Sequence, residues 1–113
     1  MSVLPYGQRR AWLLSEIEKE KIVDVLNADF VMGYAEHTGA KYRPSFFGAG
    51  WCGLLSRDLS RMVKLRQLKR SRHGLSAFEG GPGFPKWYYS YQLTPYGVDL
   101  LNEIAAQAQA KVE

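Results

Sequence analysis

One run of residues, Glu79-Gly80-Gly81-Pro82-Gly83-Phe84-Pro85, constrains the fold of this chain most. Three glycines and two prolines in seven residues can form neither a helix nor a regular strand, so this run must be a loop. Strand-forming residues flank it, with 67–72 before it and the aromatic run 87–93 after it. Two strands joined by a loop of about a dozen residues form a hairpin with a long tip.

The first part of the chain carries the pattern of a helix. Ser15 followed by Glu18 is a capping box, which predicts a helix that begins at Ser15. Apolar residues recur around it at helical spacing: Leu14, Ile17, Ile22, Val25 and Leu26. We interpret residues 1–14 as an N-terminal arm or helix extension, and residues 15–113 as one domain. Arg9 and Arg10 in this arm are expected to be solvated, with a phosphate-binding arm as the alternative.

Three further helices are expected. Asn27 or Asp29 can cap a second helix, which Gly39 ends. A third helix over about 51–65 carries a cationic face opposite an apolar stripe, formed by Leu55, Leu59, Met62 and Val63. Thr94-Pro95 opens the last helix, because threonine is a good N-cap and proline is favoured at the first helical position. The predicted fold class is α+β and mainly helical.

Basic residues are concentrated in the third predicted helix and in the strand that follows it. The whole chain has a formal net charge of +4, whereas residues 57–72 hold seven basic side chains and one acidic side chain, Asp58. Such local basicity on a periodic element is typical of phosphate binding. For any one of these arginines, the alternative is a solvent-facing charge without a ligand.

The order of the expected elements is that of a winged helix-turn-helix. Two segments carry a more specific resemblance, Leu59-Ser60-Arg61-Met62-Val63-Lys64-Leu65-Arg66-Gln67-Leu68-Lys69-Arg70 and Tyr89-Ser90-Tyr91-Gln92-Leu93-Thr94-Pro95-Tyr96-Gly97-Val98-Asp99-Leu100-Leu101. The first segment resembles a recognition helix that enters a wing strand, and the other resembles the return strand of the wing entering the last helix. The Y-x-L-T-P-x-G-x-x-L-L pattern is similar to that of the MarR and PadR groups of bacterial transcription regulators, over residues 54–103. In this pattern Gly97 is expected to let the last helix pack closely on the sheet.

The resemblance implies sequence-specific binding of double-stranded DNA through a recognition helix over about 51–65 and a wing over about 68–93. A helix fits the major groove of B-DNA, where its exposed side chains meet base edges. The expected contacts are Ser56, Arg57, Ser60, Arg61, Lys64, Arg70, Arg72, His73 and Lys86. We expect Arg57 and Arg61 to contact bases and Lys64 to contact a phosphate.

Alternation along the two strands divides their side chains between two faces. Arg70 and Arg72 therefore lie on the face opposite Lys69 and Ser71, and the sequence leaves open which pair faces the core. On the strand after the loop, Trp87, Tyr89 and Tyr91 share a face. We expect one face of this strand to be core, and stacking on unpaired bases is the alternative.

Residue patterns for catalysis or metal binding are not apparent. His37 and His73 do not have the spacing of a zinc site, and Cys52 beside an apolar helix is expected to be a small buried hydrophobe. The glycine-rich segments do not carry a Walker lysine. The sequence therefore predicts a protein that is not an enzyme and that needs no metal or other cofactor.

The expected partners are double-stranded DNA and a second copy of the chain, because a homodimer would read two half-sites. A small-molecule effector is left open. The alternative function is a winged-helix module for protein–protein interaction, with an aromatic contact patch at Tyr42, Phe46, Phe47 and Trp51. The chain has no long apolar run and its first ten residues do not resemble a signal peptide, so a cytoplasmic, nucleoid-associated location is expected. The single cysteine fits a reducing compartment.

Overall fold

The computed structural model describes residues 2–45, 48–74 and 87–112. The described elements follow one another as α1 (Tyr6–Glu20), β1 (Val23–Asp24), α2 (Ala28–Thr38), β2 (Arg43–Ser45), β3 (Gly48–Trp51), α3 (Gly53–Lys64), β4 (Leu68–Gly74), β5 (Trp87–Leu93) and α4 (Pro95–Val112). This part of the chain is α+β and mainly helical, which confirms the predicted class.

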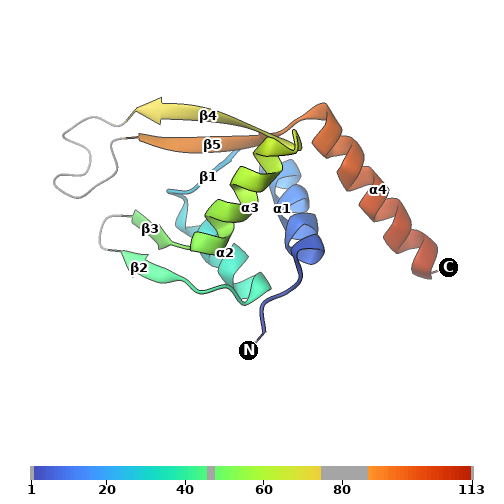
Figure 1. The fold of residues 1–113 in the computed structure, drawn as a ribbon, viewed down its shortest axis with the longest axis horizontal. Helices are drawn as coiled ribbons and strands as arrows, with labels where there is room; N and C mark the ends of the chain where they lie inside the picture. Colours follow the sequence, from blue (N-terminus) through green and yellow to red (C-terminus); the bar gives the residue numbers. More distant parts are fainter. Residues whose placement is uncertain (1, 46–47, 75–86, 113) are drawn as a thin grey trace.

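Three of the strands form one antiparallel sheet in the order β1-β5-β4. The predicted hairpin is present, and its register runs from Leu68 opposite Leu93 to Gly74 opposite Trp87. In Figure 1 the helices α1, α2 and α3 lie on one side of this sheet, the β4–β5 ribbon extends past them at one end, and α4 leaves from the other end. The other sheet is the small β2–β3 hairpin between α2 and α3.

The first helix corrects the predicted start at Ser15 and agrees with the helix extension that was left open for residues 1–14. It begins at Tyr6, so Ser15 is not its cap but an exposed residue within it. Leu13, Leu14 and Ile17 are fully buried along one stripe, and this packing continues the helix upstream of the capping-box pattern. The helix also ends earlier than expected, at Glu20, because Lys21 adopts a left-handed φ of 71°.

The residues after Lys21 were wrongly predicted to extend this helix. Val23 instead lies in β1, opposite Tyr91 of β5, and is buried there. A strand of two residues leaves no periodic pattern of its own, so the sequence carried no signal for β1.

The next two helices largely confirm the predictions. The Asn27 side chain accepts a hydrogen bond from the amide of Phe30, and Gly39 ends α2 with a left-handed φ of 81°. Leu55 and Leu59 of α3 are buried, as the apolar stripe predicted. The start of α3 differs, because Trp51 pairs with Arg43 in the β2–β3 hairpin and the helix begins only at Gly53.

The core fills the space between α1, α2, α3 and the inner face of the three-stranded sheet. Its largest fully buried side chains are Leu13, Leu14, Ile17, Val31, Tyr34, Thr38, Leu55, Leu59 and Met62. Trp12 covers one edge of it, with its ring stacked on Phe30 at a centroid distance of 6.1 Å. This packing fixes which faces of α1 and α3 are left to the solvent.

The junction between β5 and α4 agrees with the expected capping pattern. The Thr94 hydroxyl accepts the amide of Gly97 at 3.0 Å and donates to the carbonyl of Arg66 at 2.6 Å. Gly97 is buried against the start of β4, where a Cβ atom would overlap the carbonyl oxygen of Gln67. The close packing that the sequence predicted for Gly97 is therefore confirmed.

Candidate nucleic-acid interface

The outer face of α3 brings together five of the predicted contact residues. Ser56, Arg57, Ser60, Arg61 and Lys64 line a shallow, open hollow of about 440 Å³. They share this face because they recur at helical spacing opposite the buried stripe of Leu55, Leu59 and Met62. We call these five residues the α3 face.

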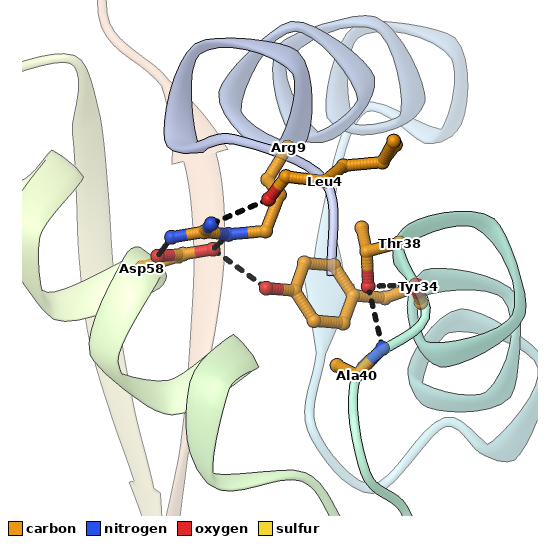
Figure 2. A network of polar contacts seen from close by, with 6 residues as sticks. All are labelled: Leu4, Arg9, Tyr34, Thr38, Ala40 and Asp58. Atoms are coloured by element: carbon orange, nitrogen blue, oxygen red, sulfur yellow. Dashed lines mark hydrogen bonds and ion pairs between the residues drawn. The ribbon is translucent and has the colours of Figure 1, made fainter. Parts of the chain in front are cut away.

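The one acidic residue of α3 points away from this face. Asp58 is 3% exposed, and its carboxylate accepts hydrogen bonds from Nε of Arg9 at 2.8 Å and from Nη2 of Arg9 at 3.1 Å. The Tyr34 hydroxyl donates to the same carboxylate at 2.6 Å. Figure 2 shows the guanidinium and the hydroxyl converging on Asp58 from two different helices.

Further hydrogen bonds fix both partners of Asp58. The remaining Arg9 nitrogen, Nη1, donates to the carbonyl of Leu4 at 2.7 Å, just before α1 begins. At the C-terminal end of α2, the Thr38 hydroxyl donates to the carbonyl of Tyr34 and accepts the amide of Ala40 (Figure 2). The network therefore ties α3 to the first turn of α1 and to the last turns of α2.

This network corrects the expectation for the N-terminal arm. Arg9 is not a solvated or phosphate-binding residue but the partner of a buried acid, with a side chain only 14% exposed. Its hydrogen bond to Asp58 raises the pKa of the Arg9 guanidinium further. Burial and the hydrogen bond to Asp58 likewise raise the pKa of Tyr34 well above its ordinary value. Tyr34 is thus a neutral donor at physiological pH.

The burial of Asp58 decides the charge of the α3 face. Arg57, Arg61 and Lys64 are exposed, and none of them forms an ion pair within the described part of the chain. An exposed acid among them would neutralise part of their field, and the only acid of the helix is paired in the interior. The face therefore presents cations and serine hydroxyls without an exposed acid.

Arg61 has an aromatic partner that was not predicted from the sequence. Its guanidinium carbon lies 3.9 Å from the centroid of the Tyr6 ring, on the first turn of α1. Burial is the main cause that raises the pKa of Tyr6, so the ring is neutral beneath the cation. The spacing of Tyr6, Arg9 and Leu13 is helical and could have placed all three on α1.

The two predicted hairpin arginines lie on one face of β4. Arg70 and Arg72 lie opposite Tyr91 and Tyr89 of β5, respectively. Their guanidinium carbons lie 4.4 Å from the ring centroid of Tyr89 and 4.8 Å from that of Trp87. Leu68 and Tyr91 lie on this same face and are buried in the core. Arg70 and Arg72, rather than Lys69 and Ser71, therefore lie on the face of β4 that continues into the core.

Of the other two predicted hairpin residues, one lies apart from these arginines and one is not described. His73 lies on the opposite face of β4, where it stacks on Tyr88 at 5.0 Å and shares a hydrogen bond with the Ser90 hydroxyl at 2.8 Å. Lys86 lies outside the described residues. His73 therefore faces away from Arg70 and Arg72, and its contact with DNA stays a prediction.

The remaining candidates lie elsewhere. Cys52 is buried before the first turn of α3, in line with a small hydrophobe. Among the described residues, no cluster of three or more histidine, cysteine, aspartate or glutamate side chains could hold a metal ion. Of the aromatic segment, Tyr42 packs against the core, Trp51 lies in β3, and Phe46 and Phe47 lie outside the described residues.

Two further findings concern membrane spans and similarity to known proteins. Within residues 2–45, 48–74 and 87–112, no helix combines the length and the apolar character needed to cross a lipid bilayer. No family model, no curated protein and no solved structure matches this chain.

Proposed function

We propose that this chain is a winged helix-turn-helix domain that binds double-stranded DNA through the α3 face. The element order supports it, because α2 and α3 precede a long hairpin and β1 pairs with the central strand of the sheet. In this interpretation α3 is the recognition helix and the β4–β5 hairpin is the wing. The single observation that carries the proposal is the α3 face, which presents cations and hydroxyls without an exposed acid.

The contacts follow from the chemistry of the side chains. An α-helix enters the major groove, and an arginine there donates two hydrogen bonds to the O6 and N7 atoms of guanine. Arg57 and Arg61 would make such contacts, with Tyr6 beneath Arg61 limiting the directions in which it can point. Lys64 would pair with a phosphate as a point charge.

The Asp58 network supplies the position of the recognition helix. Base readout needs a side chain to be placed within about half an ångström, so the rotation of α3 about its axis must be fixed. Asp58 follows Arg57 directly and is held by Arg9 of α1 and Tyr34 of α2. We propose that this network holds the α3 face outward.

The proposed biological role is transcription regulation by a homodimer. One module of this size contacts too few base pairs for useful specificity, and two-fold dimers bind inverted half-sites about one helical turn apart. The exposed flanks of α1 and α4 are the surfaces available for pairing. The hairpin arginines Arg70 and Arg72 would add contacts to the DNA backbone.

The test is binding of a labelled generic DNA duplex, measured by fluorescence anisotropy at low salt. We expect binding by the unchanged chain and a loss of at least tenfold in affinity in the double variant Arg57→Ala, Lys64→Ala. The matched control is Lys19→Ala, which removes an exposed lysine of α1 that pairs with Glu16. Absence of duplex binding by the unchanged chain, or an equal loss in the control, would contradict the proposal.

A further inference from the structure

Five side chains alternate along one face of the β4–β5 ribbon. From the core outward they are Tyr91, Arg70, Tyr89, Arg72 and Trp87, and we call them the aromatic–arginine ladder. The rings of Tyr89 and Tyr91 meet edge to face at 6.4 Å, and those of Trp87 and Tyr89 do so at 4.9 Å. The ladder is thus a continuous series of rings, and a guanidinium lies over each of the two outer rings, Tyr89 and Trp87.

The antiparallel register builds this arrangement. Residues directly opposite each other on paired strands point to the same face of a sheet. Arg72 is opposite Tyr89, and its guanidinium reaches diagonally to the ring of Trp87. Arg70 is arranged in the same way: it is opposite Tyr91, and its guanidinium reaches diagonally to the ring of Tyr89.

The two ends of the ladder have different environments. Tyr91 is 5% exposed and belongs to the core, whereas Trp87 is 42% exposed. Arg70 and Arg72 are exposed and form no ion pair with any described residue. Tyr91 therefore anchors the ladder and Tyr89 is half-buried against the core, while Trp87 and both cations are open to a ligand. The expectation that this face is core holds for Tyr91, which is buried, and in part for Tyr89, which packs against the core, but not for the exposed Trp87.

We propose that the aromatic–arginine ladder binds single-stranded nucleic acid. Unpaired bases would stack on Trp87 and on the guanidinium planes, and the outer guanidinium N–H groups would pair with the phosphates. A duplex hides the faces of its bases, so an exposed ring beside two exposed guanidinium groups favours a strand whose bases are free. This activity goes beyond the proposed duplex binding, because it needs another ligand and uses Trp87, which the α3 face does not include.

The experiment measures the affinity of the full chain for labelled oligo(dT) of about 12 nucleotides, a length within the usual range of such sites. An abasic strand of equal length keeps the phosphates and removes the bases. We expect the oligo(dT) to bind at least about tenfold more tightly than the abasic strand, because stacking contributes about 1–3 kcal/mol per base. Equal affinity for the two strands would overturn the proposal, since charge alone would then explain binding.

Variants assign the binding to the ladder. Trp87→Ala should lower the affinity for oligo(dT) about tenfold, and Trp87→Phe, which keeps a ring, should restore most of it. The double variant Arg70→Ala, Arg72→Ala should lose affinity for both strands. Lys69→Ala is the matched control, because Lys69 is an exposed cation on the opposite face of β4, and it should change the affinity about twofold or less. An equal loss in Lys69→Ala and Trp87→Ala would overturn the proposal.

Two further measurements distinguish binding by the ladder from duplex binding by α3 and from binding of acidic polymers in general. The α3 variant Arg57→Ala, Lys64→Ala should keep its affinity for oligo(dT). If α3 does not bind a duplex, oligo(dT) binding is unchanged, and if the ladder does not bind a single strand, duplex binding by α3 is unchanged. The two proposals can therefore fail separately. Polyglutamate at equal charge should compete weakly with oligo(dT). Competition as strong as that of unlabelled oligo(dT) would assign the ladder to acidic polymers and would overturn the proposal.

Discussion

The α3 face and the aromatic–arginine ladder are both cationic, but different parts of the fold hold their cations. On α3, a buried ion pair beneath the helix fixes the backbone, and Arg57 and Lys64 stay free of partners among the described residues. On the hairpin, each arginine is stacked on a ring of the neighbouring strand. On α3 only Arg61 is stacked on a ring, that of Tyr6, and Arg57 and Lys64 are not, whereas both arginines of the hairpin are oriented by rings. The two surfaces are therefore suited to different ligands.

The largest effect is expected from removing the acid beneath the α3 face. Asp58→Ala leaves the Arg9 guanidinium and the Tyr34 hydroxyl buried without their acceptor, and should lower the free energy of unfolding by about 3–5 kcal/mol. Urea denaturation measures it. A double variant, Arg9→Met with Asp58→Leu, removes both charges and should recover much of the loss. If Asp58→Ala unfolded at the same urea concentration as the unchanged chain, the network would not position α3.

A smaller loss is expected at the base of the hairpin. Gly97→Ala would favour a helix elsewhere, but here its Cβ would overlap the Gln67 carbonyl at the start of β4. We expect a loss of about 1–3 kcal/mol in the free energy of unfolding, as for an overpacked site. The comparison variant is Ala106→Gly, at an exposed position of α4, which should cost about 1 kcal/mol through helix propensity alone. A gain in stability for Gly97→Ala would show that α4 does not pack closely there.

The network also predicts how stability depends on alkaline pH. The pKa of Tyr34 is raised by burial and by its hydrogen bond to Asp58, so the folded chain keeps this proton above the usual tyrosine pKa near 10. The unfolded chain then binds fewer protons, and the free energy of unfolding should fall from about pH 10 upward, by about 1.4 kcal/mol per pH unit for this group.

Tyr34→Phe should make that fall less steep by the same amount. The slope should not vanish, because burial also raises the pKa values of Tyr6 and Tyr91. Urea titrations at a series of pH values measure the slope. An unchanged slope in Tyr34→Phe would mean that Tyr34 is not the buried donor.

The smallest expected effect is the difference between removing an arginine that is stacked on a ring and removing one that is not. Arg72→Ala removes a cation stacked on Trp87 and should lower the free energy of unfolding by about 0.5–1 kcal/mol. Arg57→Ala removes a cation without such a partner and should change it by about 0.5 kcal/mol or less. Thermal unfolding of both variants, followed by circular dichroism, measures the difference. A larger loss for Arg57→Ala would reverse the comparison.

Much of this arrangement could be predicted where the pattern is local. The apolar stripe of α3 placed Arg57, Arg61 and Lys64 on one outer face, and the Gly/Pro-rich run placed the hairpin. Thr94 before α4 and Pro95 as its first residue marked its start. In each case the relevant residues lie within a few positions of one another, so periodicity and capping chemistry decide the structure.

The missed features depend on contacts between residues far apart in the chain. Arg9 and Asp58 are 49 positions apart, and nothing in the first turn of α1 indicates that its arginine meets a buried acid. The pairing of Val23 with Tyr91 likewise ends the first helix early, against a helical pattern that continues to Leu26. Tertiary packing determined these positions, and local propensity pointed the other way.

The central claim is that the outer cations of α3 bind the phosphates and bases of a DNA duplex. The most direct test is the slope of log affinity against log salt concentration for a duplex, with the unchanged chain and with Arg57→Ala, Lys64→Ala. Each lost phosphate contact should reduce the magnitude of the slope by about 1. We predict a steep slope for the unchanged chain and a clearly shallower one for the variant. Equal slopes for the two proteins would contradict the assignment of α3 as the DNA-binding element.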